Sequence, residues 1–172
     1  MKIAVIGYSG SGKSTFAAQI SKECDIPLLH LDTVYYTEGW GVRDTDERTE
    51  IINNFMSEND SWVIDGNYSK LLMSQRMESR DKIIFFNFPR YISLYRAVKR
   101  YLTYKGRTRP SMAEGCEEKL DFEFIKWILF DGRSKEKKAS YDRIANQYPQ
   151  KFVRVKNDKQ VKKLKQILAK RK

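Results

Sequence analysis

The feature that most constrains this chain is a glycine-rich loop near its first residue. Residues 7–14 read Gly-Tyr-Ser-Gly-Ser-Gly-Lys-Ser, which matches the pattern G-x-x-x-x-G-K-[ST] in full. An apolar, β-branched run precedes the loop at residues 2–6, and a stretch with helical spacing follows it at residues 15–20. Strand, loop and helix in this order are the context in which the pattern binds phosphate, whereas an ordinary glycine-rich turn needs no such context. The sequence therefore predicts a binding site for a nucleoside triphosphate.

Each residue type in the loop has a physical reason to be there. Glycines let the backbone turn its N–H groups toward phosphate oxygens, and the start of the following helix adds positive dipole. Lys13 can reach the β- and γ-phosphates and the Ser14 hydroxyl can ligate Mg²⁺, so ATP and Mg²⁺ are the predicted cofactors. The residues predicted to bind the nucleotide are Gly7, Tyr8, Ser9, Gly10, Ser11, Gly12, Lys13, Ser14, Thr15, Arg96 and Arg100.

Length and composition set the class of protein. The chain has 172 residues, so we predict a single domain over residues 1–172. Cys24 and Cys116 lack the spacing of a disulfide framework or a zinc site, and reduced thiols are expected. No apolar stretch approaches the ~18 residues that cross a bilayer, and the first apolar run is too short for a signal peptide. We therefore expect a cytoplasmic protein with no membrane partner.

Apolar runs typical of buried strands alternate with stretches of helical spacing along the chain. The expected strands are residues 2–6, 26–31, 62–64, 82–87 and 152–155. After the helix that begins at residue 15, the expected helices are residues 44–58, 68–77, 89–104, 119–130, 134–147 and 158–170. This alternation predicts an α/β fold, a three-layer sandwich with a five-stranded parallel sheet between helices.

Two acids follow strands that should end at the same edge of the sheet as the glycine loop. Asp32 follows the second expected strand and Asp65 the third. Ligands of open parallel sheets bind outside the carboxyl ends of the strands. Asp32, Asp65 and Ser14 are therefore the predicted metal ligands, and the alternative is that the two acids cap helices or form turns. His30 is the only histidine, and we expect it to be a satisfied core residue.

A basic zone lies in the middle of the chain. Residues 82–113 contain eight Lys or Arg and no acid. Arginines on a mobile segment can close over phosphates and neutralise developing charge, so we predict a lid at residues 105–118; a solvated basic loop is the alternative. The residues predicted to take part in the chemistry are Lys13, Asp65, Arg107 and Arg109, and those predicted to bind the acceptor are Asp32, Tyr35, Trp40, Arg43, Asn67, Tyr68 and Arg76. Packing beneath a helix would equally explain the aromatic residues of this acceptor set.

A second basic zone lies at the end of the sequence. Residues 133–172 carry 15 Lys or Arg and three acids, a net charge of +12, whereas residues 1–132 carry 18 and 19. On an amphipathic helix such charge is usually a solvated face. It could also attract nucleic acid non-specifically through phosphate contacts. DNA is therefore a possible partner, although no nucleic-acid-binding motif accompanies the charge.

Four segments together resemble the bacterial family of DNA topology modulation proteins, within the adenylate kinase-like small P-loop kinases. They read Ile-Gly-Tyr-Ser-Gly-Ser-Gly-Lys-Ser-Thr at 6–15, Leu-His-Leu-Asp at 29–32, Trp-Val-Ile-Asp-Gly-Asn-Tyr at 62–68 and Gly-Arg-Thr-Arg-Pro-Ser-Met-Ala-Glu-Gly-Cys at 106–116. The resemblance implies a P-loop NTPase fold of the nucleotide kinase type. Adenylate kinases have Asp-Gly-Phe-Pro-Arg where this chain has Asp-Gly-Asn-Tyr-Ser, so their substrate-binding arginine is absent at that place.

Three functions follow from these patterns. The first is an ATP-dependent, Mg²⁺-requiring phosphotransferase that acts on a nucleotide or another small molecule. The second is a nucleotide-dependent regulatory protein that affects DNA topology through non-specific DNA binding, and the third is hydrolysis of a nucleoside triphosphate without an acceptor.

Overall fold

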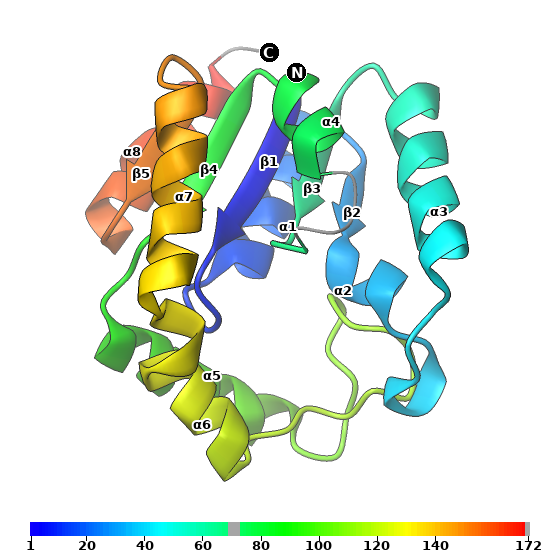
Figure 1. Ribbon diagram of the computed structural model, residues 1–172, viewed down its shortest axis with the longest axis vertical. Helices are drawn as coiled ribbons and strands as arrows, with labels where there is room; N and C mark the ends of the chain where they lie inside the picture. The colour runs from blue at the N-terminus through cyan, green and yellow to red at the C-terminus, as the bar shows by residue number, and fades with distance from the viewer. Residues whose placement is uncertain (69–72, 171–172) are drawn as a thin grey trace.

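The fold is built on five parallel strands (Figure 1), as the sequence predicts, and the computed structural model describes residues 1–68 and 73–170. The strands are β1 (Lys2–Gly7), β2 (Leu28–His30), β3 (Trp62–Asp65), β4 (Lys82–Phe86) and β5 (Phe152–Val155). Their order across the sheet is β2-β3-β1-β4-β5. In the register, Val5 and His30 lie on either side of Asp65, and Gly7 lies opposite Phe86. The glycine loop, Asp65 and His30 therefore meet at one edge of the sheet.

Helices cover both faces of the sheet (Figure 1). One face is covered by α3 (Thr45–Glu58), α4 (Met73–Glu78) and α7 (Lys135–Gln147), and the other by α1 (Lys13–Cys24) and α8 (Asp158–Ala169). Elements near the carboxyl ends of the strands are α2 (Leu31–Tyr35), α5 (Arg90–Tyr104), α6 (Phe122–Leu129) and the 3₁₀ turns η1 (Glu38–Trp40) and η2 (Asp131–Arg133). No helix among residues 1–68 and 73–170 is long and apolar enough to cross a membrane.

The two faces of β1 explain how the strands hold the helices. Val5 packs with Phe16 and Leu164 on the face of α1 and α8, whereas Ile6 packs with Phe85 and Tyr141 on the face of α7. Strand residues alternate between faces, so a strand buried on both sides must be apolar throughout. The strand that leads into the glycine loop is therefore fixed by packing on both of its faces.

Some predicted boundaries differ from the structure. The second strand was expected to end just before Asp32, but it ends at His30, and Asp32 lies in the first turn of α2. The Thr33 hydroxyl donates to the His30 carbonyl over 2.7 Å and so stabilises the turn that begins this helix. Pro89 caps α5 instead of occupying its first turn. Part of the predicted helix 68–77 falls on residues 69–72, which lie outside the described residues.

Candidate active site

The glycine loop packs closely against the end of β4 and the first turn of α5. Gly7 has φ +140°, and a Cβ added there would meet the carbonyl oxygen of Phe86 at 2.4 Å. Gly10 has φ +72°, and its Cβ would meet the carbonyl oxygen of Ser93 at 2.3 Å. Neither position has room for a side chain, and both conformations favour glycine. The end of β4 and helix α5 therefore set the shape of the loop.

Gly10→Ala should distort the loop and weaken nucleotide binding by about tenfold or more, because backbone rather than a movable side chain blocks the new Cβ. The matched control is Gly106→Ala: Gly106 has φ +68°, but nothing lies within 4 Å of its Cβ position. Both substitutions place a side chain at a similar positive φ, but only Gly10→Ala adds a steric clash. Titration with ATP and urea unfolding measure the two effects. Equal ATP affinity in both variants would contradict this account of the loop.

Lys13 is influenced by both acidic and basic side chains. Its ammonium donates to the Tyr8 carbonyl over 3.2 Å. Burial lowers the pKa of Lys13, Asp65 and Asp32 oppose that change, and Arg109 and Arg100 reinforce it. Two acids, one at the end of β3 and one in α2, and two arginines, one in α5 and one in the lid segment, therefore all act on this one ammonium, as expected where a phosphate chain is to lie.

Asp65 has one engaged oxygen and one free oxygen. Its Oδ2 lies 3.0 Å from His30 Nδ1, whereas its buried Oδ1 has no hydrogen-bond partner. Burial alone would raise the pKa of Asp65, but the His30 hydrogen bond, the Lys13 charge and the Ser14 hydroxyl together lower it below its usual value. The carboxylate is therefore ionised at neutral pH, and His30 holds it in position.

These groups fit a magnesium ion. An unpartnered carboxylate oxygen beside the Ser14 hydroxyl matches the hard oxygen ligands that Mg²⁺ prefers. Within the part of the chain that the structure describes, no three His, Cys, Asp or Glu side chains form a ready-made metal cluster. Mg²⁺ in phosphate sites commonly takes one or two protein ligands and fills the rest with water and phosphate oxygens.

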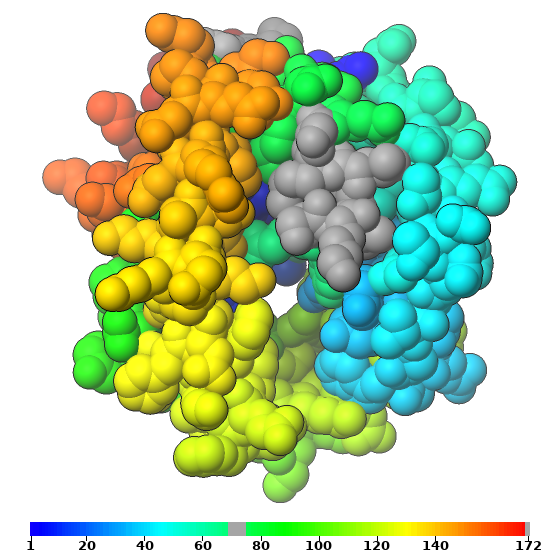
Figure 2. Space-filling model, viewed as in Figure 1, coloured from blue at the N-terminus to red at the C-terminus, as the bar shows by residue number. Residues whose placement is uncertain are grey.

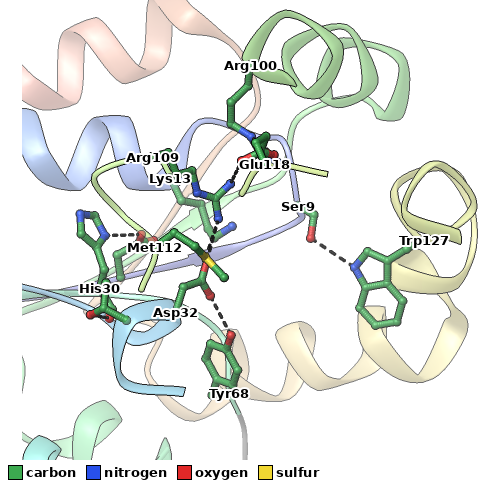
Figure 3. A network of polar contacts seen from close by, with 12 residues as sticks. Ser9, Lys13, His30, Asp32, Tyr68, Arg100, Arg109, Met112, Glu118 and Trp127 are labelled. Atoms are coloured by element: carbon green, nitrogen blue, oxygen red, sulfur yellow. Dashed lines mark hydrogen bonds and ion pairs between the residues drawn. The ribbon is translucent and has the colours of Figure 1, made fainter. Parts of the chain in front are cut away.

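A chain of charged groups connects the predicted lid to α2 (Figure 3). Asp32 accepts from Tyr68 Oη over 2.7 Å and from Arg109 Nη2 over 3.0 Å. Arg109 Nη1 also donates to Glu118 Oε2 over 3.2 Å, and Arg100 Nε donates to Glu118 Oε1 over 2.7 Å. Both oxygens of Asp32 are therefore engaged, and buried Glu118 holds two arginines together beside the glycine loop.

The lid segment, residues 105–118, lies against α2 and η1 in this structure (Figure 1). The Cys116 thiol accepts from the Trp40 backbone N–H and donates to the Thr37 carbonyl, both over 3.3 Å. Lys119, just beyond the segment, lies over the Trp40 ring at 4.8 Å. The lid segment is therefore docked on the side where the acceptor residues were predicted.

Glu118→Gln should loosen the lid segment, because the neutral amide no longer compensates the charges of Arg100 and Arg109. The expected result is faster tryptic cleavage in the segment, by about fivefold or more. Glu117→Gln is the matched control, because Glu117 is adjacent but exposed. Timed digestion followed by mass spectrometry locates the cuts. Equal cleavage rates for the two variants would mean that Glu118 does not hold the segment.

Aromatic residues of the predicted acceptor set do come together. Tyr35 stacks on Tyr68 with ring centroids 4.7 Å apart, and Tyr36 contacts Tyr35 and Trp40 edge-on. Figure 2 shows a hollow bordered by α2, the lid segment and α6. Asp32 and its tyrosine partner thus belong to a cluster of aromatic side chains around α2.

Other predicted residues have their side chains engaged elsewhere. Arg76 is fully buried, bonds the carbonyls of residues 66–68, and has its pKa lowered by burial to about 10. Arg43 bonds the Val34 carbonyl and forms a surface ion pair with Glu47. Asn67 exchanges two hydrogen bonds with the Gly7 backbone, and Arg107 is exposed. The structure therefore uses Arg76 and Asn67 to hold the loop after β3, and it leaves Arg43 and Arg107 outside the charged network.

Some of the residues predicted to bind the nucleotide also have their side chains engaged with other parts of the protein. Arg96 donates to the Ser11 carbonyl over 2.6 Å, pairs with Asp158 and lies over the Phe88 ring. The Tyr8 ring packs in the core, and Ser11 is fully buried. These groups contact the protein itself and support the loop from behind.

Sequence reasoning missed two residues of the site. Glu118 was not singled out, although it lies in the lid segment, because a buried acid looks like any other acid in the sequence. Trp127 was also missed, and its indole N–H donates to Ser9 Oγ over 3.2 Å (Figure 3). The only available signal was an aromatic residue on the helix after the lid.

The sheet order, the glycine loop and the flanking helices define the P-loop NTPase fold of the nucleotide kinase type. No protein-family model matches the chain, and no curated protein matches it. Solved structures do match. A shikimate kinase from Acinetobacter baumannii, in complex with shikimate, is 17% identical with a TM-score of 0.61, over 99% of this chain and 94% of that one.

Two further solved structures agree on the fold. A deoxyadenosine kinase from M. mycoides, with products dCMP and a flexible dCDP bound, is 15% identical (TM-score 0.54; 99% of this chain, 98% of that one). A gluconokinase from Sinorhizobium meliloti 1021 is 18% identical (TM-score 0.52; 99% and 91%). These neighbours share the fold with the chain. The resemblance to DNA topology modulation proteins and the DNA partner stay predictions.

Proposed function

We propose that the chain is an ATP-dependent phosphotransferase that uses Mg²⁺ and acts on a nucleotide or another small molecule. The observation that carries the proposal is the position of Lys13 at the end of the glycine loop, where two acids (Asp65 and Asp32) and two arginines (Arg109 of the lid segment and Arg100 of α5) all act on its ammonium. Phosphoryl transfer depends mainly on positioning and on charge around the transferred group. The kinase activity of the three structural neighbours is consistent with this proposal.

In this proposal the groups that bind ATP and Mg²⁺, the phosphate donor and its metal, come from the glycine loop and the end of β3. The loop amides and Lys13 would hold the β- and γ-phosphates, and Ser14 and Asp65 would hold the metal, with His30 fixing the Asp65 carboxylate. Bound Mg²⁺ would neutralise charge on the phosphate oxygens. The Lys13–Tyr8 hydrogen bond gives way to contact with phosphate.

For the acceptor to be phosphorylated, Arg109 must exchange its hydrogen-bond partners. Arg109 is bonded to Asp32 and Glu118, so it can contact the transferring phosphoryl group only by leaving Asp32. That movement frees Asp32 Oδ2, which then can accept a hydrogen bond from an acceptor hydroxyl, while Tyr68 keeps the carboxylate oriented. Arg107, exposed in this structure, joins the charge clamp in the same movement.

The test is a panel of acceptors incubated with ATP and Mg²⁺, with ADP formation followed by a coupled assay. Nucleosides, nucleoside monophosphates, sugar acids and cyclic hydroxy acids cover the chemistry that the hollow could admit. The expected result is that one class stimulates ADP formation and that its phosphorylated product appears by mass spectrometry. Turnover that no acceptor stimulates would instead indicate hydrolysis, and failure to bind Mg²⁺-ATP would overturn the proposal.

A further inference from the structure

A second cation-rich site lies next to Tyr8 of the glycine loop, on the face of the sheet that α7 covers. It is a cavity of about 280 Å³ between β4, β5 and α7, here named the α7 cavity. Its polar lining consists of Asn87, Asp142, Arg90, Arg133, Lys138 and Arg154. Aromatic side chains, among them Tyr8 and Tyr141, form its inner wall. None of these charged residues belongs to the network of Asp32, Arg109 and Glu118.

The cations of the α7 cavity outnumber its acids. The one lining carboxylate, Asp142, already accepts from Arg154 over 2.8 Å. Arg133 is held by neutral groups: it donates to Ser93 Oγ and to the Ile128 carbonyl, both over 3.0 Å, and lies 4.0 Å from the Tyr8 ring centroid. Among the residues that the structure describes, no carboxylate forms an ion pair with Arg90, Arg133 or Lys138.

Burial adds to this imbalance. Loss of water lowers the pKa of Arg133, because neutral hydrogen-bond partners do not replace hydration of the charge fully. A guanidinium in such surroundings gains more from an anion than an exposed one does. Phosphate is a suitable partner for the Arg133 guanidinium, because phosphate oxygens can accept hydrogen bonds from several donors at once.

We propose that the α7 cavity binds a small phosphate-bearing anion, separately from the nucleotide. Its volume of about 280 Å³ lies just below the usual range for small-molecule pockets, roughly 300–1,000 Å³, which favours a short phosphate ester or a diphosphate. Tyr8 separates the two sites, because its ring lines the cavity while its carbonyl accepts from Lys13. The inference does not depend on the phosphotransferase activity proposed above.

The test uses Lys13→Ala protein, so that the glycine loop no longer competes for anions. Pyrophosphate binding is measured by calorimetry at constant ionic strength, with inorganic phosphate and glycerol 3-phosphate as further arms that separate inorganic from organic sources. One equivalent is expected to bind, and the Asn87 side-chain amide resonance is expected to shift. Adding Lys138→Glu should weaken binding by about tenfold, because it reverses one lining charge.

Arg143→Glu is the matched control, because Arg143 is exposed on the same helix and does not line the cavity. It should change the affinity by less than about twofold. Absence of binding to the Lys13→Ala protein, or equal weakening by the two glutamate substitutions, would overturn the proposal. Weakening by Lys138→Glu alone, together with the Asn87 shift, would support it, whether or not any acceptor is phosphorylated.

Discussion

Lys13→Ala should lower the rate of phosphoryl transfer by about a thousandfold, because it removes the ammonium that we propose to contact the phosphates. The acids around Lys13 would then face the phosphates without a compensating charge. Single-turnover measurements with saturating Mg²⁺-ATP separate this loss of rate from a loss of binding. We expect both the rate of phosphoryl transfer and the affinity for Mg²⁺-ATP to fall, because in the proposed mechanism Lys13 contacts phosphate in the ground state as well as in the transition state.

Lys22→Ala is the control for this substitution. Lys22 lies on the same helix, α1, and is exposed. It removes the same charge from the chain and should leave the rate within about twofold of wild type. If Lys13→Ala bound Mg²⁺-ATP as tightly as wild type and kept its rate, the glycine loop would not be the donor site.

Asp65→Asn should reduce activity by about a hundredfold and raise the Mg²⁺ concentration needed for half-maximal rate. The amide keeps the shape of the carboxylate and can keep its contact with His30, but it removes the charge that a divalent ion requires. A Mg²⁺ titration of the initial rate, with ATP held saturating, measures both effects. Asp60→Asn, an exposed acid just before β3, is the control.

The pH dependence of the wild type gives a second measurement of Asp65. Its pKa lies below the ordinary value of 3.8, so its ionised form dominates at every pH above that value. Acidification from neutral pH to about 5 should therefore cause no loss of activity through this group. A loss centred near pH 6 that Asp65→Asn abolished would show that the carboxylate is not held ionised as described.

The sequence predicted the parts of the site that depend on local pattern. The strand before the loop, the glycines and the acid at the end of β3 were all recognisable, because short-range geometry requires those residue types in that order. The parallel sheet followed from the alternation of strands and helices. These features do not depend on which distant residues meet.

The parts that sequence reasoning did not anticipate depend on how segments pack against one another rather than on local pattern. Arg76 was expected to bind an acceptor, but the described structure buries it against the carbonyls that follow β3, and sequence alone cannot distinguish a buried arginine from an exposed one. Asp32 and Arg109 are 77 residues apart, so their ion pair depends on how the lid segment docks. Glu118 acquires its role only through the two arginines that fold around it.

The pair of hydrogen bonds between Asn67 and Gly7 fixes the segment after β3 to the glycine loop and leaves the lid segment free of that constraint. The amide of Asn67 accepts from the Gly7 N–H over 2.9 Å and donates to its carbonyl over 2.8 Å, which ties the segment after β3 to the start of the glycine loop. Asp65 and the loop therefore move as one unit, whatever the lid segment does. Changes in α2 or the lid segment can therefore accumulate over evolution without altering the geometry of the glycine loop and Asp65.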